Sequence, residues 1–173
     1  TVREISEEYD LQVLRFFMLN AHYRNPINFS RELMESAKNS LDRIITSVDN
    51  LKHLIANGRQ GDMTEEEKGL LDKTKEFYDK FDNAMDDDFN TADAISAVFE
   101  LVKYVNSNSS SDNTTAYLTA LKEKITTLTD VLGLIVDKKE EMLDSEIDEL
   151  IARRQQARKD KNFALADQIR DEL

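Results

Sequence analysis

Apolar residues recur along most of this chain at spacings of three and four, the pattern of helices that bury one face. Between these stretches the chain is polar, and it holds only four Gly and one Pro to break helices. The pattern predicts helices over 1–8, 11–22, 31–57, 65–86, 91–105, 114–132, 146–159 and 163–173. Amphipathic helices joined by short loops pack best side by side. We therefore predict an all-α fold, an antiparallel helical bundle followed by a short C-terminal helical hairpin.

Capping residues support several of these boundaries. Thr64 with Glu67 has the spacing of a capping box, and Asn90 can accept a hydrogen bond from an early N–H group of the next helix. Pro26 disfavours helical backbone at the residue before it, so a break is expected there. Gly133 suits the position just after a helix. Two stretches lack the helical pattern and are predicted as a polar loop and a charged linker: 106–113 and 136–144.

Composition narrows the functions that are open to the chain. There is no cysteine, which excludes disulfides, a thiol nucleophile and a thiolate zinc site. The net charge of −12 argues against broad nucleic-acid binding, because phosphate is contacted mainly by cations. An RNA-binding surface would have to be a local basic patch on an acidic body. No apolar run approaches the ~20 residues that span a bilayer, so no membrane partner is expected.

The first residues lack a signal-peptide pattern and an initiator Met, and the last ones fall within a helical pattern. We expect the chain to be a fragment of a larger cytoplasmic protein.

The acidic run 86–88 joins two of the predicted helices. Three adjacent Asp residues resemble Mg²⁺ ligands, but consecutive positions at a helix end point in different directions. The preferred interpretation is a solvated corner that caps the following helix. Asp93 lies in the first turn of that helix, where a negative charge suits the helix dipole.

The second charged feature is basic and lies near the C-terminal end. Its cations are Arg153, Arg154, Arg158, Lys159 and Lys161, interrupted by Asp160. Arg154 and Arg158 are four residues apart and share a helix face. Arginine can pair bidentately with phosphate or with guanine. The alternative is that these cations pair with acids of the same hairpin, and the residue types alone leave both interpretations open.

Three runs of the chain have a characteristic order of residues. They are Val-Leu-Arg-Phe-Phe-Met-Leu-Asn-Ala-His-Tyr-Arg at 13–24, Ala-Met-Asp-Asp-Asp-Phe-Asn-Thr at 84–91, and the basic run that begins with Ile-Ala-Arg-Arg at 151–154 and reaches Ala-Asp-Gln-Ile-Arg at 166–170. All three resemble runs of the bacterial cysteinyl-tRNA synthetases and follow the family's order at roughly its spacing, so the resemblance covers essentially all 173 residues.

The resemblance implies a division of the chain and a role. Residues 1–26 would end a stem-contact region, 27–135 would form a helical tRNA-binding bundle, and 144–173 would begin a C-terminal anticodon-recognition domain. The implied role is to dock the anticodon stem-loop of the cysteine tRNA. ATP-dependent cysteinylation would then be carried out by an N-terminal catalytic domain that this chain lacks.

The same resemblance assigns residues and cofactors. The implied tRNA contacts are Arg153, Arg154, Arg158, Lys159 and Lys161, together with Tyr23 and Arg24. The parent enzyme is implied to use ATP, Mg²⁺ and Zn²⁺. No cofactor or metal site is expected in this chain, because the nucleotide-binding signature and the zinc ligands of the family are absent from it. The chain alone is therefore expected to be catalytically inactive.

Two alternatives remain beside this interpretation. The helix at 11–19 is apolar on most sides, which would also suit a helical module that binds another protein. A related ligase that joins cysteine to an amino-sugar would share much of the pattern without binding tRNA. For Tyr23 and Arg24, the alternative to an RNA contact is local bonding at the end of their helix.

Overall fold

The computed structural model describes residues 1–137, 144–159 and 162–172, and the regular structure of these residues is helical. They fall into two units, Thr1–Asp137 and Lys138–Leu173, which are described separately. The helices are α1 Val2–Ser6, α2 Leu11–Leu19, α3 Arg31–Asn57, α4 Glu65–Asp72, α5 Lys75–Asp86, α6 Thr91–Asn108, α7 Thr115–Val131, α8 Asp144–Lys159 and α9 Phe163–Glu172. The predicted all-α class is confirmed.

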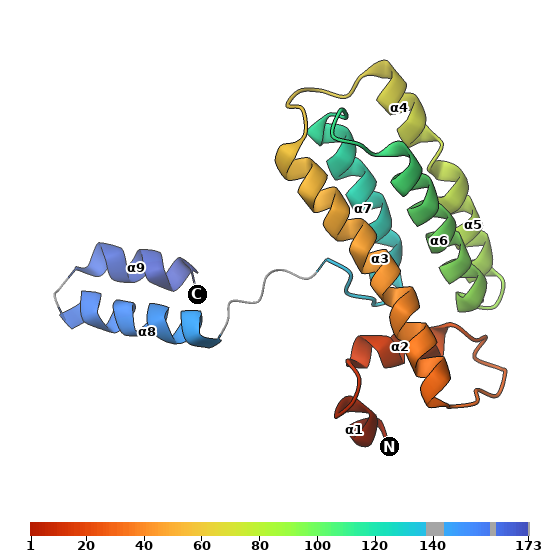
Figure 1. Ribbon diagram of the computed structural model, residues 1–173, viewed down its shortest axis with the longest axis horizontal. Coiled ribbons are helices and arrows are strands. Elements are labelled where there is room, and N and C mark those ends of the chain that lie inside the picture. Colours follow the sequence, from red (N-terminus) through yellow and green to blue (C-terminus); the bar gives the residue numbers. More distant parts are fainter. Residues whose placement is uncertain (138–143, 160–161, 173) are drawn as a thin grey trace. The chain divides into compact units, whose positions relative to one another are not determined.

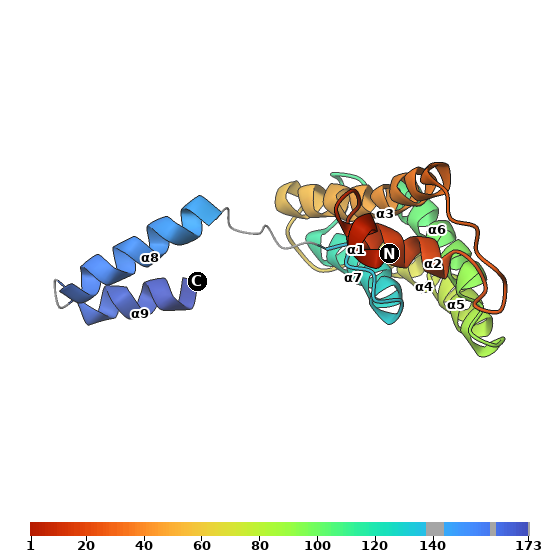
Figure 2. The same cartoon turned by 90° about the horizontal axis from the view of Figure 1, so that it is seen from below.

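The core of the first unit lies between α3, α5, α6 and α7. Helix α3 packs against α7, and α5 packs against α6 and runs antiparallel to it (Figure 1). The buried apolar face of α3 consists of Met34, Ala37, Leu41, Ile44, Val48 and Leu51. The largest fully buried side chains of the bundle include Ile44, Leu51, Leu101, Leu118, Leu121 and Ile125. Burial of a side chain of this size contributes about 1.5–3 kcal/mol. Helices α1 and α2 lie at one end of the bundle, where α2 packs against α3 (Figure 2).

A buried carboxylate joins α4 to the start of α7. Glu67 closes the predicted capping box by accepting a hydrogen bond from the Thr64 N–H group at 2.9 Å. It also accepts hydrogen bonds from the Thr114 N–H group at 2.8 Å, the Thr114 hydroxyl at 2.9 Å and the Asn113 amide at 3.2 Å. Burial raises the pKa of Glu67, but these donors outweigh burial and lower the pKa to about 2. One side chain therefore caps two helices.

The predicted single helix over 65–86 is wrong, because it is interrupted near Thr74. Helix α4 ends at Asp72, and α5 begins at Lys75. The Thr74 side chain is buried, and its hydroxyl donates to the Leu71 carbonyl at 2.6 Å. A threonine that bonds a nearby carbonyl offers the backbone an alternative to the helical hydrogen bond. The break lets α4 and α5 take different directions while both stay on the bundle.

Two other predicted boundaries shift because of distant contacts. Helix α2 ends at Leu19, before the predicted limit at residue 22, and the Leu19 carbonyl accepts a hydrogen bond from the Thr91 hydroxyl at 2.7 Å. The bundle also extends past 135, where a linker was expected. Val136 is buried, and Asp137 bonds Lys122 at 2.8 Å and pairs with Lys52 at 2.6 Å. The remaining linker residues, 138–143, lie outside the described residues.

The acidic corner between α5 and α6 is tightly wound. Asp88 and Phe89 both have a positive φ, +58° and +54°, which side-chain-bearing residues rarely adopt. Asn90 accepts a hydrogen bond from the Asp93 N–H group at 3.2 Å, so the predicted cap is confirmed. Two successive left-handed residues let α6 turn back along α5 within a short connection.

We expect the substitution Phe89→Gly to raise the free energy of unfolding by about 1 kcal/mol, because glycine has no Cβ penalty at positive φ. The Phe89 side chain is 66% exposed, so little burial is lost. Urea denaturation followed by circular dichroism measures the change. Phe89→Ala is the matched control, since it removes the ring and keeps the strained φ. An equal gain in both variants would contradict backbone strain as the cause.

Candidate nucleic-acid interface

The basic residues near the C-terminal end are carried by a helical hairpin, α8 and α9. The two helices pack through a small apolar contact that buries Leu150, Ala157 and Ile169. Asn162 starts α9, because its side-chain oxygen accepts a hydrogen bond from the Leu165 N–H group at 3.3 Å. This apolar contact fixes which side of α8 faces α9. Arg153 and Arg158 lie outside this contact and are exposed.

The arginines of this hairpin differ in exposure. Arg153 and Arg158 are exposed, whereas Arg154 is partly buried and its Nε has no hydrogen-bond partner. The side chains of Glu146 and Glu149, acids of α8 with which these arginines could pair, lie outside the described residues. Arg170 of α9 pairs with Asp167 at 3.1 Å. The side chain of Lys159 and the whole of Lys161 lie outside the described residues, and their predicted role stays a prediction.

Tyr23 and Arg24 lie at the acidic corner and bond it. The Arg24 guanidinium contacts Asp88 at 2.9 Å, and the Tyr23 hydroxyl donates to the same carboxylate at 2.9 Å. Arg24 Nε also donates to the Tyr23 oxygen at 3.0 Å, and His22 stacks on the Tyr23 ring with centroids 4.9 Å apart. The charge of Arg24 is therefore largely offset by Asp88, and this pair supports the corner more directly than it offers a free cation.

No metal centre is assembled at this corner. Across residues 1–137, 144–159 and 162–172, no group of three or more His, Asp or Glu side chains converges in a way that could hold an ion. The carboxylate of Asp88 faces Tyr23 and Arg24 instead of the neighbouring acids.

In the same described ranges, no helix is both long and apolar enough to cross a membrane.

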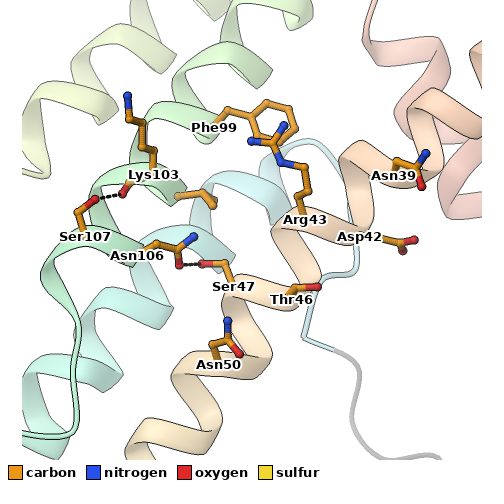
Figure 3. Close-up of a pocket in the computed structure, with 11 residues that line it drawn as sticks. Asn39, Asp42, Arg43, Thr46, Ser47, Asn50, Phe99, Lys103, Asn106 and Ser107 are labelled. Carbon is orange, nitrogen blue, oxygen red and sulfur yellow. Dashed lines mark hydrogen bonds between the residues drawn. The ribbon is translucent and has the colours of Figure 1, made fainter.

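The structure has a polar cleft between α3 and α6 that was not predicted from the sequence. It has a volume of about 500 Å³, and its charged lining residues are Asp42 and Arg43 from α3 and Lys103 from α6 (Figure 3). The other lining side chains are mostly amides and hydroxyls. The signal that could have indicated it is the run of uncharged polar residues at helical spacing on α3, at 39, 46, 47 and 50.

Comparison with known proteins gives consistent matches. Residues 80–136, from the second half of α5 through α7, match the model of the DALR domain. Over all of its 173 residues the chain is 69% identical to a cysteine–tRNA ligase of Lachnospira eligens and 44% identical to one of Clostridioides difficile. A cysteine–tRNA ligase of Lachnoclostridium phytofermentans is 49% identical over the whole chain. The chain spans only 37–38% of the length of these curated relatives.

Proposed function

Because this chain carries a DALR domain and is similar over its whole length to part of the cysteine–tRNA ligases, we propose that it is the tRNA-binding part of such a ligase. It docks the anticodon stem-loop of the cysteine tRNA through shape and phosphate contact. Cysteinylation belongs to the portion of the relatives that this chain does not cover. The observation that carries the proposal is that the whole chain aligns with cysteine–tRNA ligases at 44–69% identity.

The hairpin offers the charge that such a role needs. Arg153 and Arg158 are both exposed. Each cation that neutralises a phosphate releases condensed counterions, which makes binding favourable and dependent on salt. On a chain of net charge −12, this patch has to act locally. Arg154 has an unpartnered Nε, which leaves a donor whose hydrogen bond a bound phosphate could supply if the side chain turns outward.

In this proposal, the cysteinylation chemistry belongs to the part of the ligase that this chain does not cover. We assign ATP, Mg²⁺ and Zn²⁺ to that same part, as the chain's resemblance to the family implies. The chain itself has no cysteine. Its contribution is to position the tRNA, in the cytoplasm, so that the acceptor end reaches a distant active site.

We expect the double variant Arg154→Glu/Arg158→Glu to bind the cysteine tRNA at least ~10-fold more weakly than the wild-type chain, because two phosphate contacts become repulsive. The slope of log K against log [salt] should also fall by about two. Fluorescence anisotropy with labelled tRNA at about 50 and about 200 mM salt measures both quantities.

Lys68→Glu/Lys75→Glu is the matched control, since it changes the net charge equally at exposed positions on α4 and α5. A non-cognate tRNA is the specificity control. The proposal is contradicted if the wild-type chain fails to prefer the cysteine tRNA, or if both double variants lose affinity to the same extent. Far-ultraviolet circular dichroism establishes that each variant keeps its helices.

A second candidate function, protein docking, is favoured by an apolar groove at the N-terminal end. The groove has a volume of about 760 Å³, and α1, α2 and the segment before α3 line it with Val2, Ile5, Leu14, Phe17, Met18, Ile27 and Phe29. Met18 and Phe29 are 53% and 55% exposed. A patch of this kind usually marks a protein contact. We propose that its occupant is the catalytic portion of the parent ligase, so this surface complements tRNA binding.

A further inference from the structure

The polar cleft between α3 and α6 has no role in the functions argued so far. Its floor is firmly held, because Ser47 is buried and its hydroxyl donates to the Asn106 side-chain oxygen at 2.7 Å (Figure 3). This bond joins α3 to α6 across the cleft and fixes the orientation of the Asn106 amide. In the part of the chain that the structure describes, the amide nitrogen of Asn106 has no partner. It is a donor held in place and free to bind a ligand.

The cations of the cleft are also free of acids. Arg43 lies over the ring of Phe99, with its guanidinium carbon 5.2 Å from the ring centroid. Phe99 in turn packs edge-on against buried Phe16, with centroids 6.3 Å apart. In the described ranges, no carboxylate forms an ion pair with Arg43 or Lys103. The ring therefore positions the guanidinium without neutralising it.

Several other cations of the same unit form ion pairs. Arg31 pairs with Glu8 at 2.8 Å, Arg24 with Asp88 at 2.9 Å, and Lys80 with Glu100 at 2.6 Å. On a chain of net charge −12, Arg43 and Lys103 bring two cations together on one cleft. Asp42 is the one acid among the lining residues. The cleft is thus suited to an anion.

The remaining lining groups indicate which anion. Small-molecule pockets are lined mainly by apolar side chains, with few polar ones. Here hydroxyls and amides predominate, including Thr46, Asn50 and Ser107. Phosphate and sugar groups of nucleic acids are contacted by Arg and Lys together with Ser, Thr and Asn side chains. This combination matches a ribose–phosphate chain better than an isolated metabolite.

We propose that the α3–α6 cleft binds the ribose–phosphate backbone of an RNA, with Arg43 and Lys103 contacting phosphate oxygens and Asn106 donating to the same chain. The cleft lies in the first unit and is separate from the residues of the α8–α9 hairpin. It rests on the proposed function in that the RNA is the tRNA bound by this chain. It adds a second contact, with its own residues, to that function.

The test measures the affinity of the full chain for labelled cysteine tRNA. We expect Arg43→Glu/Lys103→Glu to weaken binding at least ~10-fold and to lower the salt slope by about two, as the loss of two phosphate contacts requires. The neutral variant Arg43→Gln/Lys103→Gln should weaken binding by a smaller factor. Because it adds no repulsion, it still reports on the cleft if charge reversal disturbs packing on Phe99.

The outcomes separate this inference from the proposed function. If the cleft variants bind like Lys68→Glu/Lys75→Glu while Arg154→Glu/Arg158→Glu loses affinity, the cleft is not a contact and the proposed function stands. If the wild-type chain binds no tRNA, both are overturned. If the neutral cleft variant weakens binding while the Lys68 and Lys75 control does not, the cleft is a contact.

Discussion

Glu67→Gln is expected to lower the free energy of unfolding by about 3 kcal/mol at neutral pH. The variant keeps the shape of the side chain but replaces an anion that accepts four hydrogen bonds from Thr64, Asn113 and Thr114. A buried hydrogen bond to a charged group contributes about 1.5–3 kcal/mol, and an unpaired buried donor costs about 1–3 kcal/mol. A glutamine amide nitrogen would also face donors. Chemical denaturation at neutral pH measures the loss.

Glu67 also makes the free energy of unfolding depend on pH. The pKa of Glu67 is lowered from 4.5 to about 2 in the folded chain, because its donors outweigh the effect of burial. A lowered folded pKa means that the stabilisation is fully present above about pH 4.5 and is lost as pH falls toward about 2. A shift of this size corresponds to about 3 kcal/mol. The Glu67→Gln variant should therefore lack this component of acid unfolding.

Glu66→Gln is the matched control, because Glu66 lies on the same helix turn and is exposed. It should leave both the neutral-pH stability and the acid dependence close to those of the wild-type chain. If Glu66→Gln and Glu67→Gln lose stability equally, the effect comes from the helix dipole of α4 and not from the link to α7.

Phe16→Ala is expected to lower the free energy of unfolding by about 3–5 kcal/mol, the usual cost of truncating a buried Phe. Phe16 is 0% exposed and joins α2 to α6 through its edge-on contact with Phe99. Urea denaturation of the full chain gives the value. Met18→Ala, on the same helix and 53% exposed, should cost under about 1 kcal/mol. Equal losses would show that α2 is not anchored through Phe16.

Local patterns in the sequence determined the helices and most of their caps. Thr64 and Asn90 each cap a helix in the structure, as their spacing predicted. A cap is a contact between residues two or three positions apart, so its information is contained within one turn of chain. The resemblance to the cysteinyl-tRNA synthetases could also be read from local patterns, because the runs at 13–24, 84–91 and 151–170 each have a characteristic order of residues.

Only the tertiary structure decided which polar groups meet across the bundle. Glu67 lies 47 positions before Thr114, and Arg24 lies 64 before Asp88, yet each pair is bonded. Such contacts between distant residues determine where α2 ends, balance the charge of Arg24 and hold the Glu67 carboxylate in a buried position. Helical spacing shows on which face of its own helix a residue lies. It does not show which other helix packs against that face. The Arg43–Phe99 cleft depends on that facing helix, and so no pattern along α3 alone could place it.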